Sequence, residues 1–464
     1  MHPTSGKQGL GGLMQRLSPA WLLVLYYLLA IVAGALLLTT PWAARAEPLS
    51  FLDALFTATS AQCVTGLAVV DTGNALSLFG QLVVLALIQL GGLGLMTFSV
   101  YFFLALRLGV GGRGRWIIHE TLLHTPVSSW PELVRSVLRL SLTIEAVGTL
   151  LLALVLVPQL GWAAGLFSAL FHAVSAFCNA GFSLFSDSLT AYRAHPLVNF
   201  TIMTLIVLGG IGFLVLREML DFLRQLPQTR RRPPVLSLHA KVVLLTSAVL
   251  IVGGTLLILL LEHANAFASV PSGEACLVAL FHSISARTAG FNSIDLAQLR
   301  TPTLFLIIFL MFVGASPGSA GGGVKTTSLA LFWAIFSNRL RGNRHTSLFR
   351  RTLPDELVTR ALALVLLALI LMALALFALL CVQSPDLQHE TTRPFLSSAF
   401  EVVSAFATTG LSMGETARLT VAGKLIIIVL MFIGRVGLLT LAFAIAGRER
   451  PAGARYAEEN IMIG

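Results

Sequence analysis

The sequence predicts an all-α integral membrane protein with four helix–pore loop–helix repeats, that is, eight spans and four re-entrant loops around a pseudo-fourfold axis. Three observations lead to this fold class. Hydrophobic residues make up 56% and charged residues only 11% of the 464-residue chain, whereas soluble domains carry roughly a quarter of charged residues. A short segment ending in glycine recurs four times, and a second glycine-rich element follows every copy.

Apolar runs of membrane-spanning length recur along the chain. Six of them contain 18 or more nearly uncharged residues, close to the ~20 with which a helix crosses ~30 Å of hydrocarbon. We expect a span in each of these runs: Trp21–Leu38, Leu140–Val157, Val198–Leu216, Val242–Leu261, Leu362–Val382 and Leu425–Ala446. No segment is long or polar enough for a separate soluble domain, so one membrane domain is expected.

The recurring segment is the strongest signal in the sequence. Its copies end at Gly66, Gly181, Gly290 and Gly410, at separations of 115, 109 and 120 residues. Each copy contains a phenylalanine, a Ser-Ala pair, and small or hydroxyl residues before the glycine. The half-apolar stretch that leads to the Ser-Ala pair is too short to span a bilayer, and such stretches are typical of re-entrant segments.

The second element follows each of these glycines at 24 to 28 residues. Its copies are Leu90–Gly94, Leu208–Gly212, Val313–Ser316 and Ile433–Gly437. These glycines serve either transport or close packing between helices, as small residues do in membrane interfaces. The complete repeats are expected at residues 1–106, 107–224, 225–345 and 346–464.

Basic residues are distributed unevenly over the connecting segments. If both termini are cytoplasmic, the inner segments hold 22 Lys and Arg, the outer segments seven, and the membrane two. This positive-inside pattern predicts a multi-pass protein of the bacterial cytoplasmic (inner) membrane, and it explains the net charge of +10 without a nucleic-acid partner. The Arg217–Lys241 segment, with Arg230–Arg232, is expected to meet an acidic partner or anionic membrane lipids.

Enzymatic, metal and redox chemistry are not indicated. The chain has no P-loop, catalytic triad or paired carboxylates, so we expect no enzyme and no covalent cofactor. His172 and His282, at matching positions of two repeats, are expected to find partners within the protein rather than to bind a metal. The four cysteines lack CxxC spacing and are scattered over Cys63, Cys178, Cys276 and Cys381.

The four re-entrant loops can build a cation site from backbone alone. Non-helical backbone at membrane depth is tolerated only where it is packed in protein or lines a wet cavity, and rings of carbonyls replace the hydration shell of a cation. Glycine can take φ > 0 and turn carbonyls toward the axis. The residues expected to form this filter and to bind the ion are Val64, Thr65, Gly66, Asn179, Ala180, Gly181, Thr288, Ala289, Gly290, Thr408, Thr409 and Gly410.

The apolar run after the third copy is interrupted by proline and several glycines, which cannot hold a continuous helix. Such interruptions point to transport sites, so we predict a flexible gate loop across the pore below the filter. A simple kink or a short internal connection is the alternative. The expected gate residues are Gly314, Ala315, Ser316, Pro317, Gly318, Ser319, Ala320, Gly321, Gly322, Gly323, Lys325 and Arg435.

Arg435 lies in the middle of an apolar run, where an arginine costs ~2.5–3.5 kcal/mol on insertion scales. Two roles are open for it. It either sets a repulsive barrier for cations in the cavity under the filter, or it anchors the structure by bonding to loop carbonyls. Lys325 could serve either way, and Glu401 and Arg287 are candidates for a charge pair near the outer end of the filter.

The filter segments resemble those of a known family. Ser285–Asn292, Asn179–Phe182 and Thr408–Ser412 are similar to filter segments of the Trk/Ktr/HKT cation transporters, and the resemblance covers nearly the whole chain. One span precedes the first filter, and the chain ends in Tyr456–Gly464. Both features are similar to the KtrB group of this superfamily rather than to its longer TrkH group.

The resemblance implies uptake of K⁺, frequently with Na⁺ as activator, by a homodimer with one pore per subunit. It also implies a KtrA-like cytosolic ring of nucleotide-binding regulatory domains. Glycine in all four filters matches the K⁺-selective pattern, whereas Cys63, Cys178 and Met413 depart from it. A Na⁺-conducting, HKT-like transporter is therefore the alternative. An ion-coupled transporter of organic solutes is disfavoured, because the chain has few acids to embed in the membrane.

Overall fold

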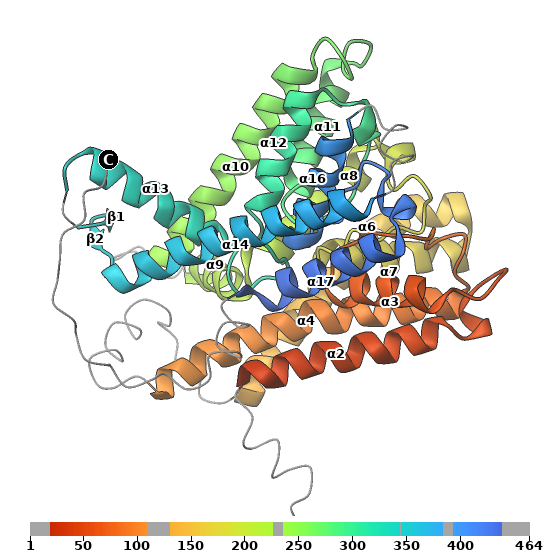
Figure 1. Ribbon diagram of the computed structural model, residues 1–464, viewed down its shortest axis with the longest axis horizontal. Helices are drawn as coiled ribbons and strands as arrows, with labels where there is room; N and C mark the ends of the chain where they lie inside the picture. Colours follow the sequence, from red (N-terminus) through yellow and green to blue (C-terminus); the bar gives the residue numbers. More distant parts are fainter. Residues whose placement is uncertain (1–18, 110–129, 226–234, 344, 384–392, 439–464) are drawn as a thin grey trace, which may run out of the picture.

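The computed structural model describes residues 19–109, 130–225, 235–343, 345–383 and 393–438, and helices dominate these segments (Figure 1). The basic Arg230–Arg232 stretch and the ending Tyr456–Gly464 lie outside the described residues.

Each quarter of the chain contains a long helix, a short apolar helix and a further helix, in this order. The first quarter has α2 (Pro19–Leu38), α3 (Phe51–Gln62) and α4 (Leu78–Gly109), and the second α6 (Trp130–Leu160), α7 (Trp162–Phe177), α8 (Pro196–Ile211) and α9 (Phe213–Gln225). The third has α10 (Leu238–Glu262), α11 (Ser272–Ser285), α12 (Thr301–Phe312) and α13 (Thr326–Leu340). The fourth has α14 (Asp355–Val382), α16 (Pro394–Ala407) and α17 (Val421–Val436).

Short elements connect these helices. Between the third and fourth quarters, β1 (Ser347–Leu348) and β2 (Arg351–Thr352) pair as an antiparallel hairpin. Single 3₁₀ turns are η1 (Pro41–Ala43), η2 (Thr190–Tyr192), η3 (Leu296–Gln298) and η4 (Thr416–Arg418).

Local sequence sets where the helices begin. Ser50 accepts a hydrogen bond from the Asp53 N–H at the start of α3, and Thr420 accepts one from the Gly423 N–H at the start of α17. Both side chains satisfy amide groups that have no partner within the helix. Proline stands in the first turn of α8, α12 and α16, where its missing N–H costs nothing and its fixed φ suits the helix.

The quarters pack on one another in a closed cycle. Helix α4 packs on α7, α8 on α11, α12 on α16, and α17 on α3. The last contact places the fourth quarter, blue in Figure 1, beside the first, red and orange. The Lys424 ammonium and the Asp53 carboxylate join α17 and α3 at 2.6 Å. The end of the chain thus closes a ring with its beginning.

In three quarters, a glycine of the second element allows two helices of the same quarter to pack closely. A Cβ built on Gly91 would lie 2.0 Å from the carbonyl oxygen of Gln62, at the end of α3. The corresponding distances from Gly209 and Gly434 to the carbonyls at the ends of α7 and α16 are 1.8 and 1.9 Å. No side chain fits at such distances, so these glycines let α4, α8 and α17 pack directly on the last turns of α3, α7 and α16.

The helices after the filters are broken more often than the sequence predicts. A continuous span over Val198–Leu216 is wrong, because the chain bends by 106° between α8 and α9, at Gly212 with φ 96°. Helix α17 ends before Gly437, which has φ 86°, within the span expected at Leu425–Ala446. The run after the third filter is interrupted between α12 and α13, as its proline and glycines predict.

Among the described residues, five helices are long and apolar enough to cross a membrane: α2, α4, α6, α10 and α14. The bent pair α8 and α9 makes a sixth if it is counted as one span. The breaks leave α12 and α17 with 12 and 16 residues, below the ~20 of an unbroken span. Counting whole helices therefore gives fewer than eight, and the eight-span arrangement stays a prediction.

Candidate functional site

The four glycine-ended segments meet around one centre. A Cβ built on any of their glycines would lie between 2.1 and 2.7 Å from a backbone carbonyl oxygen of the neighbouring segment. The glycines Gly66, Gly181, Gly290 and Gly410 face the carbonyl oxygens of Ala180, Ala289, Thr409 and Thr65, in this order. Each segment thus abuts the next, and the fourth abuts the first. We call these four segments the glycine ring.

The backbone of the glycine ring has the same unusual conformation in each quarter. Two residues before each glycine, a residue with a side chain adopts φ between 52° and 72°. These residues are Val64, Asn179, Thr288 and Thr408. The left-handed region costs roughly 1–2 kcal/mol for such residues. Strain of this kind persists where the surroundings impose it, and it concentrates at functional sites.

Hydrogen bonds fix which way the peptide groups of the ring point. The residue before each glycine donates its N–H to the backbone carbonyl of the serine in the Ser-Ala pair, at 2.7 to 2.9 Å. These donor and acceptor pairs are Thr65 and Ser60, Ala180 and Ser175, Ala289 and Ser285, and Thr409 and Ser404. The N–H and C=O of a trans peptide point in opposite directions, so the carbonyls of the preceding residues turn away from the short helices, toward the centre.

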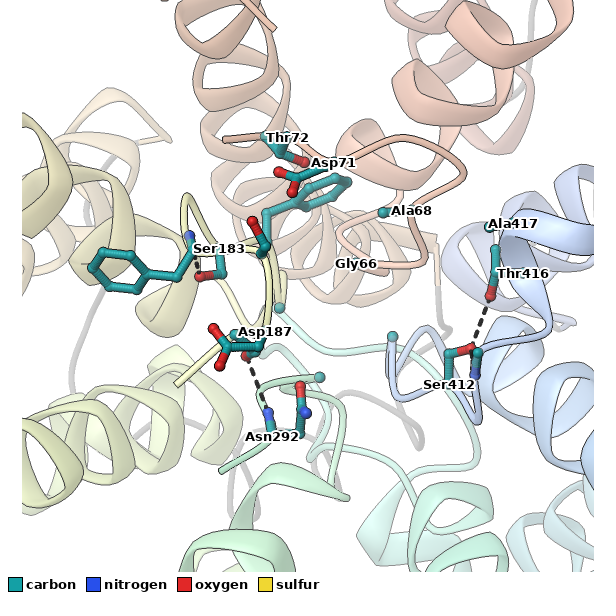
Figure 2. Close-up of a pocket in the computed structure, with 18 of the residues that line it drawn as sticks. Gly66, Ala68, Asp71, Thr72, Ser183, Asp187, Asn292, Ser412, Thr416 and Ala417 are labelled. Carbon is teal, nitrogen blue, oxygen red and sulfur yellow. Dashed lines mark hydrogen bonds between the residues drawn. The ribbon is translucent and has the colours of Figure 1, made fainter. Parts of the chain in front are cut away.

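A cavity of about 360 Å³ lies on one side of the ring, lined by the residues that follow the glycines. Figure 2 shows segments of all four quarters around it, among them Gly66, Ser183, Asn292 and Ser412. Three carboxylates line this cavity, at Asp71, Asp187 and Asp295. The cavity therefore presents negative charge to whatever approaches the ring from this side.

The Asp71 carboxylate is held in its charged form. Burial raises the pKa of this carboxyl, but hydrogen bonds from Ser186, Asn74 and Gly73 outweigh burial and leave the pKa below its ordinary value. The backbone N–H groups of Gly73 and Asn74 donate to Asp71 Oδ1 at 2.8 and 2.9 Å. Its negative charge is therefore retained as the pH falls toward the ordinary pKa of an aspartate.

Neutralising an acid of the cavity should weaken cation capture. A unit charge ~10 Å from an ion in water is worth ~0.4 kcal/mol, so Asp71→Asn or Asp187→Asn should raise the KM for a transported cation about twofold at low ionic strength. The effect should shrink at physiological salt, where the Debye length is ~8 Å. Initial uptake rates at two ionic strengths measure it. The exposed Asp355, at the start of α14, gives the control Asp355→Asn, and an equal effect there would contradict capture by the cavity.

A loop connects α12 and α13 on the other side of the ring. It is mostly buried, and it contacts the residues that precede the ring glycines, because the Gly322 N–H donates to Thr408 Oγ1 at 3.1 Å. The ten consecutive residues predicted for the gate, Gly314 to Gly323, all lie in this loop. The cavity and the loop thus lie on opposite sides of the ring.

The loop is tied to the second quarter where α8 breaks. Ser316 N–H donates to the Gly210 carbonyl at 3.0 Å, and Phe213 N–H donates to the Gly318 carbonyl at 3.0 Å. A Cβ on Gly212 would lie 2.4 Å from the carbonyl oxygen of Pro317. The bend at Gly212 therefore makes room for the loop, which explains why an apolar run is broken there.

Arg435 links this loop to the first quarter. Its guanidinium donates to the Ala320 carbonyl of the loop, to the Gly91 carbonyl at 2.6 Å and to the Tyr27 hydroxyl at 3.2 Å, and the side chain is 1% exposed. Of the two roles considered for Arg435, these contacts favour the anchor. Lys325 Nζ donates to the Gly321 carbonyl within the same loop at 2.8 Å.

Replacing Arg435 should loosen the loop. Arg435→Gln leaves buried carbonyls without donors, at ~1–3 kcal/mol for each unsatisfied group. We expect faster amide hydrogen exchange of the loop in the purified protein, together with a higher cation flux. The matched control is Arg360→Gln, which removes only an exposed pair with Glu356. Raised flux with unchanged exchange of the loop would instead support the electrostatic barrier.

Other polar side chains predicted near the ring have local partners. The predicted charge pair between Arg287 and Glu401 is wrong: Arg287 donates to Ser247 Oγ at 3.0 Å, and Glu401 accepts from the hydroxyls of Ser412 and Thr416. His172 contacts the Ser168 carbonyl and Ser183 Oγ at 2.8 and 2.9 Å, and the Nδ1 of His282 contacts the Val278 carbonyl at 3.0 Å. No cluster of metal-ligating side chains occurs among the described residues.

The sequence analysis missed one buried carboxylate behind the second segment of the ring. Glu145 of α6 is 3% exposed and accepts from Gln89 Nε2 of α4 at 2.9 Å. The thiol of Cys178, just before the ring residue Asn179, lies 3.9 Å from Glu145 Oε1. The sequence did contain a signal for this residue, because Glu145 is an acid within the apolar Leu140–Val157 run. Ionisable residues within membrane-spanning segments mark functional positions.

Comparison with known proteins identifies the class. The family model described as TrkH, cation transport protein, matches residues 23–451. The chain therefore belongs to the TrkH family of cation transport proteins, a family of multi-pass membrane transporters rather than of enzymes.

Several curated proteins are similar to this chain over nearly its whole length, and two of them are named as proteins of a Ktr system. The chain is 40% identical to the Ktr system potassium uptake protein B of Bacillus subtilis, over 97% of each chain. It is 39% identical to the protein of the same name in Vibrio alginolyticus, over 96% of this chain and 94% of the other. The potassium/sodium uptake protein NtpJ of Enterococcus hirae is 38% identical over 97% of this chain and 98% of its own length.

A solved structure shares the fold. The potassium transporter TrkH from Vibrio parahaemolyticus superposes with a TM-score of 0.70 at 20% sequence identity, over 92% of this chain and 85% of that chain.

Proposed function

We propose that this protein mediates K⁺ uptake across the bacterial cytoplasmic membrane, as the pore subunit of a Ktr-type system. The observation that carries the proposal is the glycine ring, in which backbone carbonyls from four quarters of one chain point at a common centre. Carbonyls so arranged replace the water around a dehydrated K⁺. The names of the two Ktr relatives, both potassium uptake proteins, support K⁺ as the substrate.

The transport path runs from the acidic cavity through the ring to the loop. The twelve predicted filter residues bind K⁺ through their carbonyls, and the loop from Gly314 to Lys325, held by Arg435, acts as the gate. Four helix–pore loop–helix repeats with eight spans place both termini in the cytoplasm, in agreement with the excess of Lys and Arg in the inner segments. Transport is channel-like, because no residue along the path has to change its chemical state for the ion to pass.

The protein works as a homodimer, with one pore in each subunit. A KtrA-like cytosolic ring that binds nucleotide sets the state of the gate, and Na⁺ acts as an activator. The word "system" in the names of the relatives supports a partner subunit. The basic segment around Arg217, on the inner side in this topology, contacts the partner or anionic lipid headgroups.

Ion competition tests the substrate. We expect the chain to restore growth at low K⁺ to a bacterium that lacks its own K⁺ uptake, and excess K⁺ to suppress ⁸⁶Rb⁺ uptake far more strongly than excess Na⁺ does. Cells with the empty vector are the control. Uptake that excess K⁺ leaves unchanged would rule out the proposal.

A Na⁺-conducting transporter is the second candidate. One relative is named as a potassium/sodium uptake protein, which favours passage of both ions. If Na⁺ and K⁺ at the same concentration suppress ⁸⁶Rb⁺ uptake equally strongly, the result supports this second candidate.

A further inference from the structure

Four serines occupy the same place behind the glycine ring. Each is the serine of the Ser-Ala pair in the last turn of a short helix or directly at its end, and each is fully buried. They are Ser60, Ser175, Ser285 and Ser404. Their backbone carbonyls all accept from the residue before the ring glycine, and that of Ser285 also accepts from the Gly290 N–H at 3.4 Å, but their hydroxyl groups fall into two classes.

In the first and fourth quarters the hydroxyl accepts a hydrogen bond from the ring glycine. Gly66 N–H donates to Ser60 Oγ at 3.1 Å, and Gly410 N–H donates to Ser404 Oγ at 3.1 Å. Because the peptide is planar and trans, this bond directs the carbonyl of the residue before the glycine toward the centre. The Thr65 and Thr409 carbonyl oxygens lie against Gly410 and Gly290 of the neighbouring segments, as the Ala180 and Ala289 carbonyl oxygens lie against Gly66 and Gly181. These hydroxyls therefore fix ion-facing carbonyls.

In the second and third quarters the hydroxyl donates instead. Ser175 Oγ donates to the Phe182 carbonyl at 2.8 Å, and Ser285 Oγ donates to the Phe291 carbonyl at 2.5 Å. Both carbonyls belong to the residue after the ring glycine, on the side of the acidic cavity. A carbonyl that accepts from a buried hydroxyl behind the ring is turned away from the centre.

The matching carbonyls of the first and fourth quarters are not held in this way. Among the described residues, no hydrogen bond reaches the carbonyls of Leu67 or Leu411. The outer edge of the ring thus differs between two halves, the adjacent first and fourth quarters and the adjacent second and third quarters, although the residue two before each glycine has φ > 0 in all four.

We propose that the four serine hydroxyls are positioning residues with two tasks, an inference that rests on the K⁺ transport proposed above. Ser60 and Ser404 hold the carbonyls of Thr65 and Thr409 in place and thereby maintain discrimination between K⁺ and Na⁺. Ser175 and Ser285 keep the carbonyls of Phe182 and Phe291 out of the path, so that the outermost ion is bound by fewer oxygens and leaves easily.

The experiment compares single Ser→Ala variants in liposomes, with the ratio of K⁺ to Na⁺ uptake and the KM for K⁺ as readouts. Ser60→Ala and Ser404→Ala should lower the K⁺/Na⁺ ratio about fivefold, the ratio that corresponds to one hydrogen bond. Ser175→Ala and Ser285→Ala should leave this ratio unchanged and lower the KM for K⁺ about threefold, because the freed carbonyl adds an ion ligand.

Further variants separate positioning from folding. Ser→Cys at each site leaves no cavity and puts a weakly bonding thiol in place of the hydroxyl, so it should reproduce the effect of alanine even where alanine fails to accumulate. Ser→Thr retains the hydroxyl and should restore the wild-type ratio. Ser141, a buried serine of α6 with 2% exposure, supplies the control Ser141→Ala.

Two outcomes overturn the inference: the same effect at all four sites, or an unchanged K⁺/Na⁺ ratio in both Ser60→Cys and Ser404→Cys. If the unmodified protein transports no K⁺, the proposed function itself fails. If it transports K⁺ and only the variants disagree, the assignment of the serines alone fails.

Discussion

A single methyl group added at Gly410 should abolish transport. In Gly410→Ala the new Cβ would lie 2.1 Å from the Thr65 carbonyl oxygen, on a residue with φ 86°. Overpacking costs ~1–3 kcal/mol and a left-handed side chain ~1–2 kcal/mol. A combined ~3 kcal/mol corresponds to a loss of roughly 100-fold. Initial rates of ⁸⁶Rb⁺ uptake, normalised to protein in the membrane, measure the loss.

Two control variants show whether the loss belongs to the ring. Gly253 of α10 and Gly273 of α11 have nothing within 4 Å of an added Cβ, so Gly253→Ala and Gly273→Ala should transport normally. Gly410→Ala protein that reaches the membrane in normal amount and still transports at the wild-type rate would contradict the assignment of the ring as the ion path.

Removing the loop should open the path without the regulatory partner. The ends of the loop are already adjacent: Val313 and Val324 form a β-bridge, and a Cβ on Gly314 would lie 3.1 Å from the Gly323 Cα. Deleting Ala315 to Gly322 therefore joins two residues whose Cα atoms are about as close as the ~3.8 Å between bonded neighbours. The deletion removes the hydrogen bonds to the second quarter and one of the three acceptors of Arg435, the Ala320 carbonyl. We expect uptake at least ~10-fold above that of the full-length chain, since ~1.4 kcal/mol in favour of the closed state is a factor of ten.

The control deletion removes a hairpin of the same region. Leu353 N–H donates to the Thr346 carbonyl at 2.9 Å across the base of the β1–β2 hairpin, so the chain can be closed after deletion of Ser347 to Thr352, at the loss of the two hydrogen bonds between Ser347 and Asn338 of α13. Uptake in the absence of partner should not rise in this variant. Low uptake after the loop deletion, from protein that is present and stable, would show that the loop is no gate.

The parts of the site that depend on internal repetition could be predicted from the sequence. Four matching glycines indicated four equivalent segments, and each was found to abut the next. The serines behind them were equally visible, because the Ser-Ala pair recurs in every copy. Their role was not, since the hydroxyls of serines at matching positions accept from Gly66 in one quarter and donate to the Phe182 carbonyl in another. The identity of the serine and of its alanine neighbour, which is the same in every copy, does not encode that difference.

The breaks in the helices and the hydrogen-bond partners of the buried Arg435 side chain could be found only from the structure. Gly212 lies in a long apolar run, where glycine is equally typical of helix packing, and its bend exists because a loop of the third quarter occupies the adjacent space. Arg435 was recognised as costly in the membrane, yet Tyr27 and Gly91 precede it by 408 and 344 residues. Contacts between residues so far apart in the sequence form because the fourth quarter packs on the first. No periodic sequence pattern predicts them.

The ring of this protein comes from a single polypeptide, and this has a consequence for how the coordination shell can vary. In an assembly of four identical chains, one amino-acid substitution changes the same residue in all four segments of the ring. In this protein, one substitution changes only one of the four segments. The pairs Val64–Thr65, Asn179–Ala180, Thr288–Ala289 and Thr408–Thr409 accordingly differ in size and polarity, although their main chains share one conformation. If the ring binds the ion as proposed, a substitution can therefore change the side chain at one of the four positions while the backbone carbonyls of the other three continue to bind the ion.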